Sequence, residues 1–295
     1  MGQMRWRAAV LAAVLTAASD GDARAGQYAR VSDDLSLYYE DVGQGLPVVL
    51  IPGWTMSTEV FEHQLADLAR THRVIAYDPR SQGLSTKTLE HNNYAQHGRD
   101  LAALLARLDL DRVILVGWSA GCYDAYAYVR AEGTDRLAGF VCIDMPPRGF
   151  ALQPGDWAAM AATPEDVADL RGGLDEIAAD RPALHAELAA IMNARELSAD
   201  EIDWFVRQAM LTPTDAMLAL RLDWTFSDYT AEAKAMDGKI PVLQVLSEWS
   251  TAAGQPWLAA NTPHAATARM KRHMSFWSEP DEFNRQLEAF LVGLR

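Results

Sequence analysis

The serine best placed for nucleophilic chemistry in this chain is Ser119. It lies in the pentapeptide Gly117-Trp118-Ser119-Ala120-Gly121, which directly follows the apolar run 113–116. In such a G-x-S-x-G pattern the serine occupies a strained strand-to-helix turn, and the glycines relieve the crowding around it. The next backbone N–H, from Ala120, can then stabilise an oxyanion. A Gly-Ser turn that only caps a helix has the same letters, but the flanking strand and helix patterns favour the catalytic interpretation.

Strands and helices that alternate along the chain must position this turn. Apolar runs of strand length are separated by amphipathic stretches of helix length. This alternation predicts an α/β fold with a mostly parallel central sheet and helices on both faces. The predicted strands are residues 27–31, 35–40, 48–51, 74–77, 113–116, 140–143 and 242–246, and the predicted helices include 58–70 and 94–108.

Residues 146–238 interrupt this alternation. The segment is rich in alanine, has helical composition and is interrupted by prolines that include Pro154, Pro182 and Pro213. It predicts a helical cap inserted into a core formed by residues 26–145 and 239–295. Most of the tryptophan and methionine side chains of the cap are expected to pack helix against helix, and a minority to line a pocket for an apolar acyl or alcohol group.

The N-terminal residues 1–25 are typical of a secretory signal peptide. Arg5 and Arg7 precede the apolar stretch 8–18, and Ala23-Arg24-Ala25 offers a small-x-small cleavage site. The apolar stretch is shorter than the roughly 20 residues that span a bilayer. We therefore expect a secreted or periplasmic protein without membrane association once the signal is removed.

Charge and cysteine content limit the classes of partner. A formal net charge of -14 disfavours nucleic acid and anionic membrane surfaces, because a phosphate backbone needs cationic contacts. The two cysteines, Cys122 and Cys142, are too few for a disulfide framework, and we interpret them as buried small side chains. Their elements should lie close together, so a single disulfide stays an open alternative. A monomer or small homo-oligomer is expected.

Taken in order, the motifs resemble those of the α/β-hydrolase superfamily over essentially all of the chain after residue 25. Besides the elbow at Ser119, Ile51-Pro52-Gly53-Trp54 resembles the loop after the family's third strand. Tyr77-Asp78-Pro79-Arg80-Ser81-Gln82-Gly83-Leu84-Ser85 resembles the family's Asp-x-Arg-Gly-x-Gly-x-Ser loop, with Ser81 replacing a glycine. The pattern is most similar to the esterase, lactonase and cofactor-free haloperoxidase branches. The resemblance implies an α/β-hydrolase fold that needs no cofactor and no metal.

The resemblance also assigns roles outside the elbow. The backbone N–H of Trp54 would be the second oxyanion donor beside that of Ala120. Pro52 stands where the family usually has histidine, and this change leaves the main-chain donor intact. The side chains of Trp54 and Trp118 would border the bound substrate.

His273 is the general base that the resemblance implies. It follows Met270-Lys271-Arg272 and precedes an amphipathic C-terminal segment, as in the family's histidine loop. An imidazole there can accept the proton of Ser119 and return it to the leaving alcohol. His264 is the nearest rival among the seven histidines, but it precedes the predicted last strand rather than following it.

The triad acid departs from the commonest family pattern. The position after residues 242–246 that usually holds aspartate corresponds to Ser250, which cannot carry the negative charge. Two replacements are present, Asp144 at the end of strand 140–143 and Glu248 in the expected loop. We favour Asp144, because strand carboxyl ends converge on the elbow in this fold. Haloalkane dehalogenases and zearalenone-type lactonases include members with an acid after this strand.

These residues predict a serine hydrolase that cleaves a small-molecule ester or lactone through an acyl-enzyme intermediate. Cofactor-free perhydrolysis, as in haloperoxidases, and carbon-carbon bond hydrolysis are alternatives on the same site, because fold and triad do not fix the substrate. A third alternative is a ligand-binding protein with a degenerate hydrolase fold, which the irregular acid position suggests. Covalent labelling of Ser119 would separate this last alternative from the others.

Overall fold

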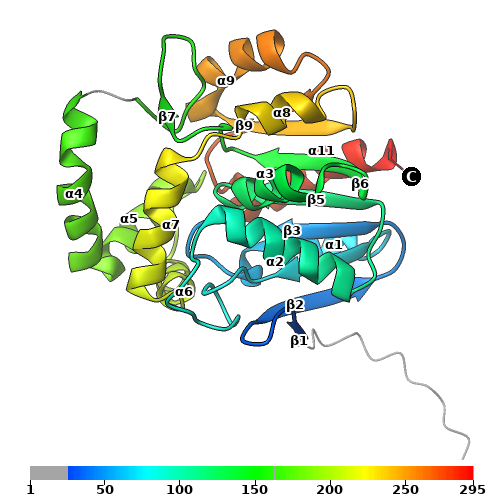
Figure 1. Cartoon of the computed structure of the whole chain (residues 1–295), viewed down its shortest axis with the longest axis horizontal. Helices are drawn as coiled ribbons and strands as arrows, with labels where there is room; N and C mark the ends of the chain where they lie inside the picture. Colours follow the sequence, from blue (N-terminus) through cyan, green and yellow to red (C-terminus); the bar gives the residue numbers. More distant parts are fainter. Residues whose placement is uncertain (1–25, 162–163, 295) are drawn as a thin grey trace, which may run out of the picture.

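The central sheet is built from strands on both sides of the predicted cap. The computed structural model describes residues 26–161 and 164–294, and the predicted signal peptide lies outside them. The sheet strands are β1 (Gln27–Arg30), β2 (Ser36–Gly43), β3 (Pro47–Ile51), β4 (Arg73–Tyr77), β5 (Val113–Trp118), β6 (Leu137–Ile143), β9 (Val242–Ser247) and β10 (Ala266–Met270). Among the described residues these eight strands lie in the order β1-β2-β4-β3-β5-β6-β9-β10 (Figure 1). The pairs β1–β2 and β2–β4 are antiparallel, and all pairs from β4 to β10 are parallel.

Helices cover both faces of this sheet (Figure 1). The core helices are η1 (Thr58–Phe61, a 3-10 turn), α1 (Glu62–Leu68), α2 (Tyr94–Arg107), α3 (Gly121–Glu132), α8 (Thr230–Met236), α9 (Glu248–Asn261), α10 (Ser275–Ser278) and α11 (Pro280–Val292). On one face α2 and α8 pack against α3, and on the other α1 packs against α11. The predicted α/β-hydrolase fold is therefore confirmed. No helix in the described ranges is long and apolar enough to cross a bilayer.

Local sequence explains where these elements begin and end. β5 is buried along its whole length, as expected for an apolar strand with helices on both faces of its sheet. The side chain of Asn93 caps α2 by accepting a hydrogen bond from the backbone N–H of Gln96 at 2.9 Å. The helix predicted over 58–70 differs in detail, because it begins as the η1 turn and continues as α1 only to Leu68.

Most of the helices between β6 and β9 form a layer beyond one end of the sheet (Figure 1). Its elements are α4 (Pro164–Ala179), α5 (Arg181–Met192), α6 (Ala199–Met210) and α7 (Thr214–Phe226), with the short strands β7 (Phe150–Ala151) and β8 (Met160–Ala161) beside them. We call α4 to α7 the cap. Although α8 falls within the segment 146–238, it packs on α3, and Met236 belongs to the hydrophobic core beneath it.

Polar contacts hold the cap against the loop that follows β3. The Ser57 hydroxyl donates to the side-chain oxygen of Gln208 at 2.6 Å. The carboxylate of Glu59 accepts hydrogen bonds from the indole of Trp204 at 3.1 Å and from the amide of Gln208 at 2.9 Å. These contacts fix α6 relative to η1.

A disulfide joins Cys122 on α3 to Cys142 on β6, and their Cα atoms lie 5.5 Å apart. Both side chains are fully buried. The two cysteines are buried as expected, and they form the single disulfide that the sequence left as an open alternative. It links the helix that follows Ser119 to the strand that precedes Asp144.

We expect the double substitution Cys122→Ser, Cys142→Ser to lower the free energy of unfolding by about 3 kcal/mol, because a cross-link over a sequence separation of 20 restricts the unfolded chain. Urea denaturation of the wild type and the variant measures this difference. As a control, alkylation followed by mass spectrometry should modify the wild type only after it is both unfolded and reduced. Equal stability of the two proteins would contradict the prediction.

Candidate active site

Ser119 lies at the turn between β5 and α3, where the sequence pattern placed it. Its φ of 54° is in the left-handed region that non-glycine residues rarely adopt. The backbone N–H of Ser119 donates to the carbonyl of Ile143 at 2.8 Å, and the N–H of Cys122 donates to the carbonyl of Ser119 at 2.9 Å. These bonds anchor the strained turn to both the adjacent strand and the helix that it starts.

The glycines on either side of Ser119 are required by close backbone contacts. A Cβ at Gly117 would lie 2.6 Å from the carbonyl oxygen of Gly121. A Cβ at Gly121 would lie 2.4 Å from the carbonyl oxygen of Ile51 at the end of β3. The elbow can therefore pack closely on the loop after β3 only if both positions lack a side chain.

Asp144 lies beside Ser119 because of the register of the sheet. Trp118 on β5 pairs with Ile143 on β6, so the residues that follow the two strands are neighbours. Asp144 also has a left-handed backbone, with φ of 56°, and its N–H donates to the carbonyl of Val245 on β9 at 2.8 Å. Its side chain is buried, with the residue 6% exposed.

His273 reaches this carboxylate from the loop after β10. Its Nδ1 lies 2.7 Å from Oδ2 of Asp144. The indole N–H of Trp118 donates to the backbone carbonyl of His273 at 2.9 Å, and the N–H of Met274 donates to the carbonyl of Met192 in the cap at 2.8 Å. The loop is thus held by the elbow on one side and by α5 on the other.

The second oxygen of Asp144 is also occupied. Oδ1 accepts hydrogen bonds from the backbone N–H of Ser247 at 2.9 Å and from the hydroxyl of Ser250. Burial raises the pKa of Asp144, but the hydrogen bond and charge of His273 together with these two donors outweigh it, so the pKa lies below its ordinary value. Asp144 is therefore an ionised partner for the imidazole at neutral pH.

The two rival residues lie elsewhere. Glu248 is the first residue of α9 rather than part of a loop, and its exposed carboxylate forms an ion pair with Arg272 at 3.3 Å. His264 is exposed and its Nδ1 contacts Asp237 at 2.8 Å. The structure therefore brings Asp144, and not Glu248, to the ring of His273.

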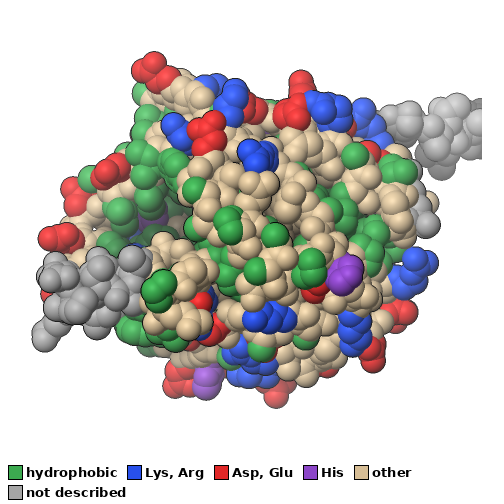
Figure 2. All heavy atoms as spheres, turned by 90° about the horizontal axis from the view of Figure 1, so that it is seen from above, with side chains coloured by type: hydrophobic (Ala, Val, Ile, Leu, Met, Phe, Trp, Pro, Cys, Tyr) green, Lys and Arg blue, Asp and Glu red, His purple; other side chains and the backbone are tan. Residues whose placement is uncertain are grey.

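Ser119 and His273 open onto a cavity of about 240 Å³ between the sheet and the cap. Its walls are largely aromatic and aliphatic. The lining residues are Trp54, Thr55, Met56, Trp118, Ser119, Ile177, Leu184, His185, Leu188, Met192, Phe205, Arg221, Trp224 and His273. On the side of the molecule where the cap lies, Figure 2 shows hydrophobic side chains gathered around a recess.

The two predicted oxyanion donors flank the elbow. Trp54 follows Gly53, whose Cβ position would lie 3.1 Å from Cβ of Ser119. Within the described residues, no protein acceptor takes a hydrogen bond from the backbone N–H of Trp54 or of Ala120. The indole N–H of Trp54 donates instead to the carbonyl of Met217 at 2.8 Å, which fixes this ring as a wall between the elbow and α7.

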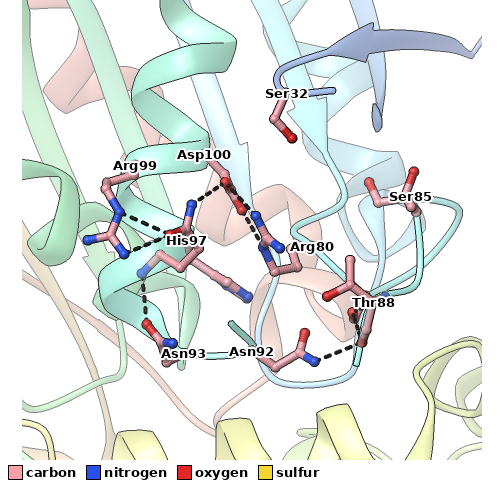
Figure 3. A network of polar contacts seen from close by, with 12 residues as sticks. Ser32, Arg80, Ser85, Thr88, Asn92, Asn93, His97, Arg99 and Asp100 are labelled. Carbon is pink, nitrogen blue, oxygen red and sulfur yellow. Dashed lines mark hydrogen bonds and ion pairs between the residues drawn. The ribbon is translucent and has the colours of Figure 1, made fainter. Parts of the chain in front are cut away.

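The loop after β4 is held by its own buried charges. Asp78 accepts hydrogen bonds from the backbone N–H groups of Thr58 at 2.7 Å and Leu84 at 2.6 Å, and burial raises its pKa to about 6 despite these donors. Arg80 and Asp100 point toward each other from the loop and α2 (Figure 3), with a bidentate pair at 2.8 and 2.9 Å. These charges stabilise the loop and lie outside the cavity lining.

Two titratable residues of the cavity were missed by the sequence analysis, His185 on α5 and Arg221 on α7. Both lie in alanine- and leucine-rich helical stretches without a recognisable motif, and only the packing of the cap brings them to Ser119. His185 is 1% exposed and its Nε2 has no partner among the described residues. Burial, with a contribution from the charge of Arg181, lowers the pKa of His185 to about 4. Its imidazole is therefore neutral at pH 7.

The described residues contain no group of three or more His, Cys, Asp or Glu side chains placed to hold a metal ion. The chemistry that the residues of the cavity can perform on their own is nucleophilic attack by a serine, proton transfer by a histidine and stabilisation of the resulting charges.

Comparison with known proteins gives consistent results. A family model described as alpha/beta hydrolase fold matches residues 47–173. A putative non-heme chloroperoxidase of Synechocystis sp. is 34% identical over 156 residues, which cover 52% of this chain and 54% of that protein. The chain thus spans about half the length of this curated relative.

Solved structures match over a larger share. A bromoperoxidase from Bacillus anthracis is 26% identical with a TM-score of 0.80, covering 91% of this chain and 100% of that chain. The esterase EaEST from Exiguobacterium antarcticum shares the fold with the same TM-score of 0.80 at 20% identity, with coverage of 91% and 100%. These matches extend the shared fold over 91% of this chain.

Because His185 is buried, we expect the free energy of unfolding to fall in acid. Its pKa in the folded protein is about 4, against an ordinary value of 6.5, so between these values the unfolded chain binds more protons and stability falls as the pH falls. We expect His185→Gln to lose less stability than the wild type between about pH 7 and about pH 4.5, an interval that covers most of this window. Urea denaturation at both pH values measures the two slopes, and identical slopes would contradict the prediction.

Proposed function

Because the chain belongs to the α/β-hydrolase superfamily, we propose that it is a serine hydrolase that cleaves a carboxylic ester or lactone through an acyl-enzyme intermediate. The observation that carries this proposal is that His273, paired with Asp144 at 2.7 Å, lines the same cavity as Ser119 on its strained elbow. A nucleophile, a base and an orienting acid are the parts that such a reaction requires.

From these contacts we propose a role for each reacting atom. With Nδ1 of His273 on Asp144, Nε2 is the ring nitrogen available to accept the proton of Ser119. The serine oxygen then attacks the carbonyl carbon, and the backbone N–H groups of Trp54 and Ala120 stabilise the oxyanion. His273 gives its proton to the leaving alcohol, activates water to hydrolyse the acyl-enzyme, and returns the proton to Ser119.

Perhydrolysis is a second candidate, because two of the similar proteins are named as a chloroperoxidase and a bromoperoxidase. In this reaction hydrogen peroxide would replace water as the nucleophile on the acyl-enzyme, and a peracid would leave in place of the acid. The ratio of peracid to acid formed from one ester in the presence of peroxide distinguishes the two activities. If the ratio is no higher than that of the uncatalysed reaction of the ester with peroxide, perhydrolysis is excluded.

Export from the cytoplasm remains part of the proposal. It is motivated by the sequence of residues 1–25. The Cys122–Cys142 disulfide supports it, because disulfides persist in oxidising compartments. Expression with residues 1–25 present, followed by fractionation and N-terminal sequencing, tests this location. An uncleaved chain confined to the cytoplasm would contradict it.

We expect Ser119→Ala to lower kcat for a 4-nitrophenyl ester by about a thousandfold or more, because the nucleophile is removed. Release of 4-nitrophenolate measures the rate. Ser32→Ala, at an exposed serine of the β1–β2 turn, is the matched control and should retain wild-type turnover. If Ser119→Ala kept its activity, ester cleavage would have to occur by another mechanism.

The acid assignment predicts a ranking of two conservative variants. Asp144→Asn should lower kcat by roughly a thousandfold or more, because the amide favours the wrong tautomer of the imidazole and does not stabilise its cation. Glu248→Gln should change kcat by no more than about twofold, because an exposed ion pair contributes little. The reverse ranking in the same ester assay would move the acid to α9.

A further inference from the structure

Arg221 introduces a positive charge into a cavity that is otherwise largely apolar. It is partly buried on α7 and lines the same cavity as Ser119 and His273. It is the only arginine or lysine among the described residues that line this cavity. An arginine side chain stays charged at any pH at which the protein is folded.

The guanidinium of Arg221 has few protein partners. It lies over the ring of Trp224, 4.1 Å from the centroid, and one N–H points at the sulfur of Met160 at 3.8 Å. No ion pair to a carboxylate is formed by Arg221 within the described part of the chain. Burial lowers the pKa of the guanidinium, which reflects the cost of sheltering this charge from water.

Arg80 and Arg181, which are more deeply buried, have stronger acceptors, although Nε of Arg181 has no partner among the described residues. Arg80 forms the bidentate pair with Asp100. Arg181 of the cap has no carboxylate partner, but it donates to the carbonyls of Ala209 at 3.0 Å and Thr212 at 2.7 Å. Arg221 differs from both, because its visible contacts are a π-face and a thioether, which are weak acceptors. Its N–H donors remain available to a bound molecule.

His185 gives an independent indication of a polar group in the ligand. Its imidazole is buried in the cavity wall beside the ring of Trp54, with 6.0 Å between the centroids, and its Nε2 lacks a partner. Because this imidazole is neutral at pH 7, it can donate or accept a hydrogen bond and adds no second positive charge to compete with Arg221 for an anion.

On these observations, and resting on the hydrolase proposed above, we propose that Arg221 binds an anionic group of the substrate. The substrate class is an ester or lactone with a carboxylate that is separated from the scissile carbonyl by an apolar aliphatic or aromatic body. The carboxylate would accept hydrogen bonds from the guanidinium, and the apolar body would contact walls such as Trp54, Leu188 and Phe205. The overall charge of -14 does not prevent this, because charges beyond a Debye length of about 8 Å are largely screened.

Binding tests the proposal without any turnover. Isothermal titration should show that 4-phenylbutyrate binds the wild type more tightly than the neutral 4-phenylbutyramide. Arg221→Met should reduce this preference by about tenfold or more, because a charge-assisted pair is lost. Arg221→Lys keeps the charge and should retain part of the preference. Arg207→Met, at an exposed arginine of α6, is the control and should bind like the wild type.

Turnover of a matched ester pair gives the second readout. One substrate is the mono-4-nitrophenyl ester of adipic acid, which keeps a free carboxylate, and the other is the same compound with that carboxylate methylated. For the wild type, kcat/KM should be higher for the substrate with the carboxylate. The ratio of the two kcat/KM values should fall in Arg221→Met. Circular dichroism checks that Arg221→Met is folded. If the folded variant keeps the carboxylate preference of the wild type in either assay, the anion site is overturned. A preference in binding that depends on Arg221, together with no turnover of either ester, would instead support the anion site and overturn the hydrolase.

Discussion

The register between β5, β6 and β9 determines where the reactive groups can lie. Trp118 pairs with Ile143, and Ile143 pairs with Val245, so these strands end at neighbouring positions on one edge of the sheet. The hydrogen-bond ladder continues past the strand ends, from the N–H of Ser119 to Ile143 and from the N–H of Asp144 to Val245, both at 2.8 Å. Ser119 and Asp144 therefore follow adjacent strands, and each has a left-handed backbone that turns its chain away from the sheet.

This register also explains how the proposed acid, Asp144, can follow β6 instead of β9. A carboxylate after β6 lies close enough to β9 for the first turn of α9 to donate hydrogen bonds to it. Ser250, at the position where the family usually has its acid, now supplies a hydroxyl donor to Asp144. The N–H of Ser247 is a second donor. The carboxylate of Asp144 thus lies one strand away from the position that is commonest in the superfamily, and Ser250 at that position stabilises its negative charge.

The fold and the elbow could be predicted because their signals are local. The apolar run before Ser119 and the glycines around it specify a strand, a turn and a helix without reference to the rest of the chain. Asp144 could be favoured over Glu248 because the carboxyl ends of the strands converge on the elbow. The local sequence predicted a loop at Glu248, whereas α9 begins there. Secondary structure at this point depends on Ser247, whose side chain caps the helix.

The cavity lining and the disulfide could not be predicted because they depend on packing between distant segments. Arg221 and His185 lie on different cap helices, and nothing in their neighbouring residues distinguishes them from surface positions of an amphipathic helix. The pairing of Cys122 with Cys142 likewise depends on how α3 crosses β6. In each case the sequence shows the type of residue, but not its distance from its partner or the burial of its side chain.

The central claim is that Ser119 is an activated nucleophile, and covalent modification tests it without knowledge of the substrate. Intact-mass spectrometry of the protein after exposure to a fluorophosphonate, beside Ser119→Ala treated in the same way, is the most direct measurement. The account predicts a single adduct in the wild type and none in the variant, because the base that activates the serine is in place. The absence of an adduct in the wild type, or the same adduct in both proteins, would contradict it.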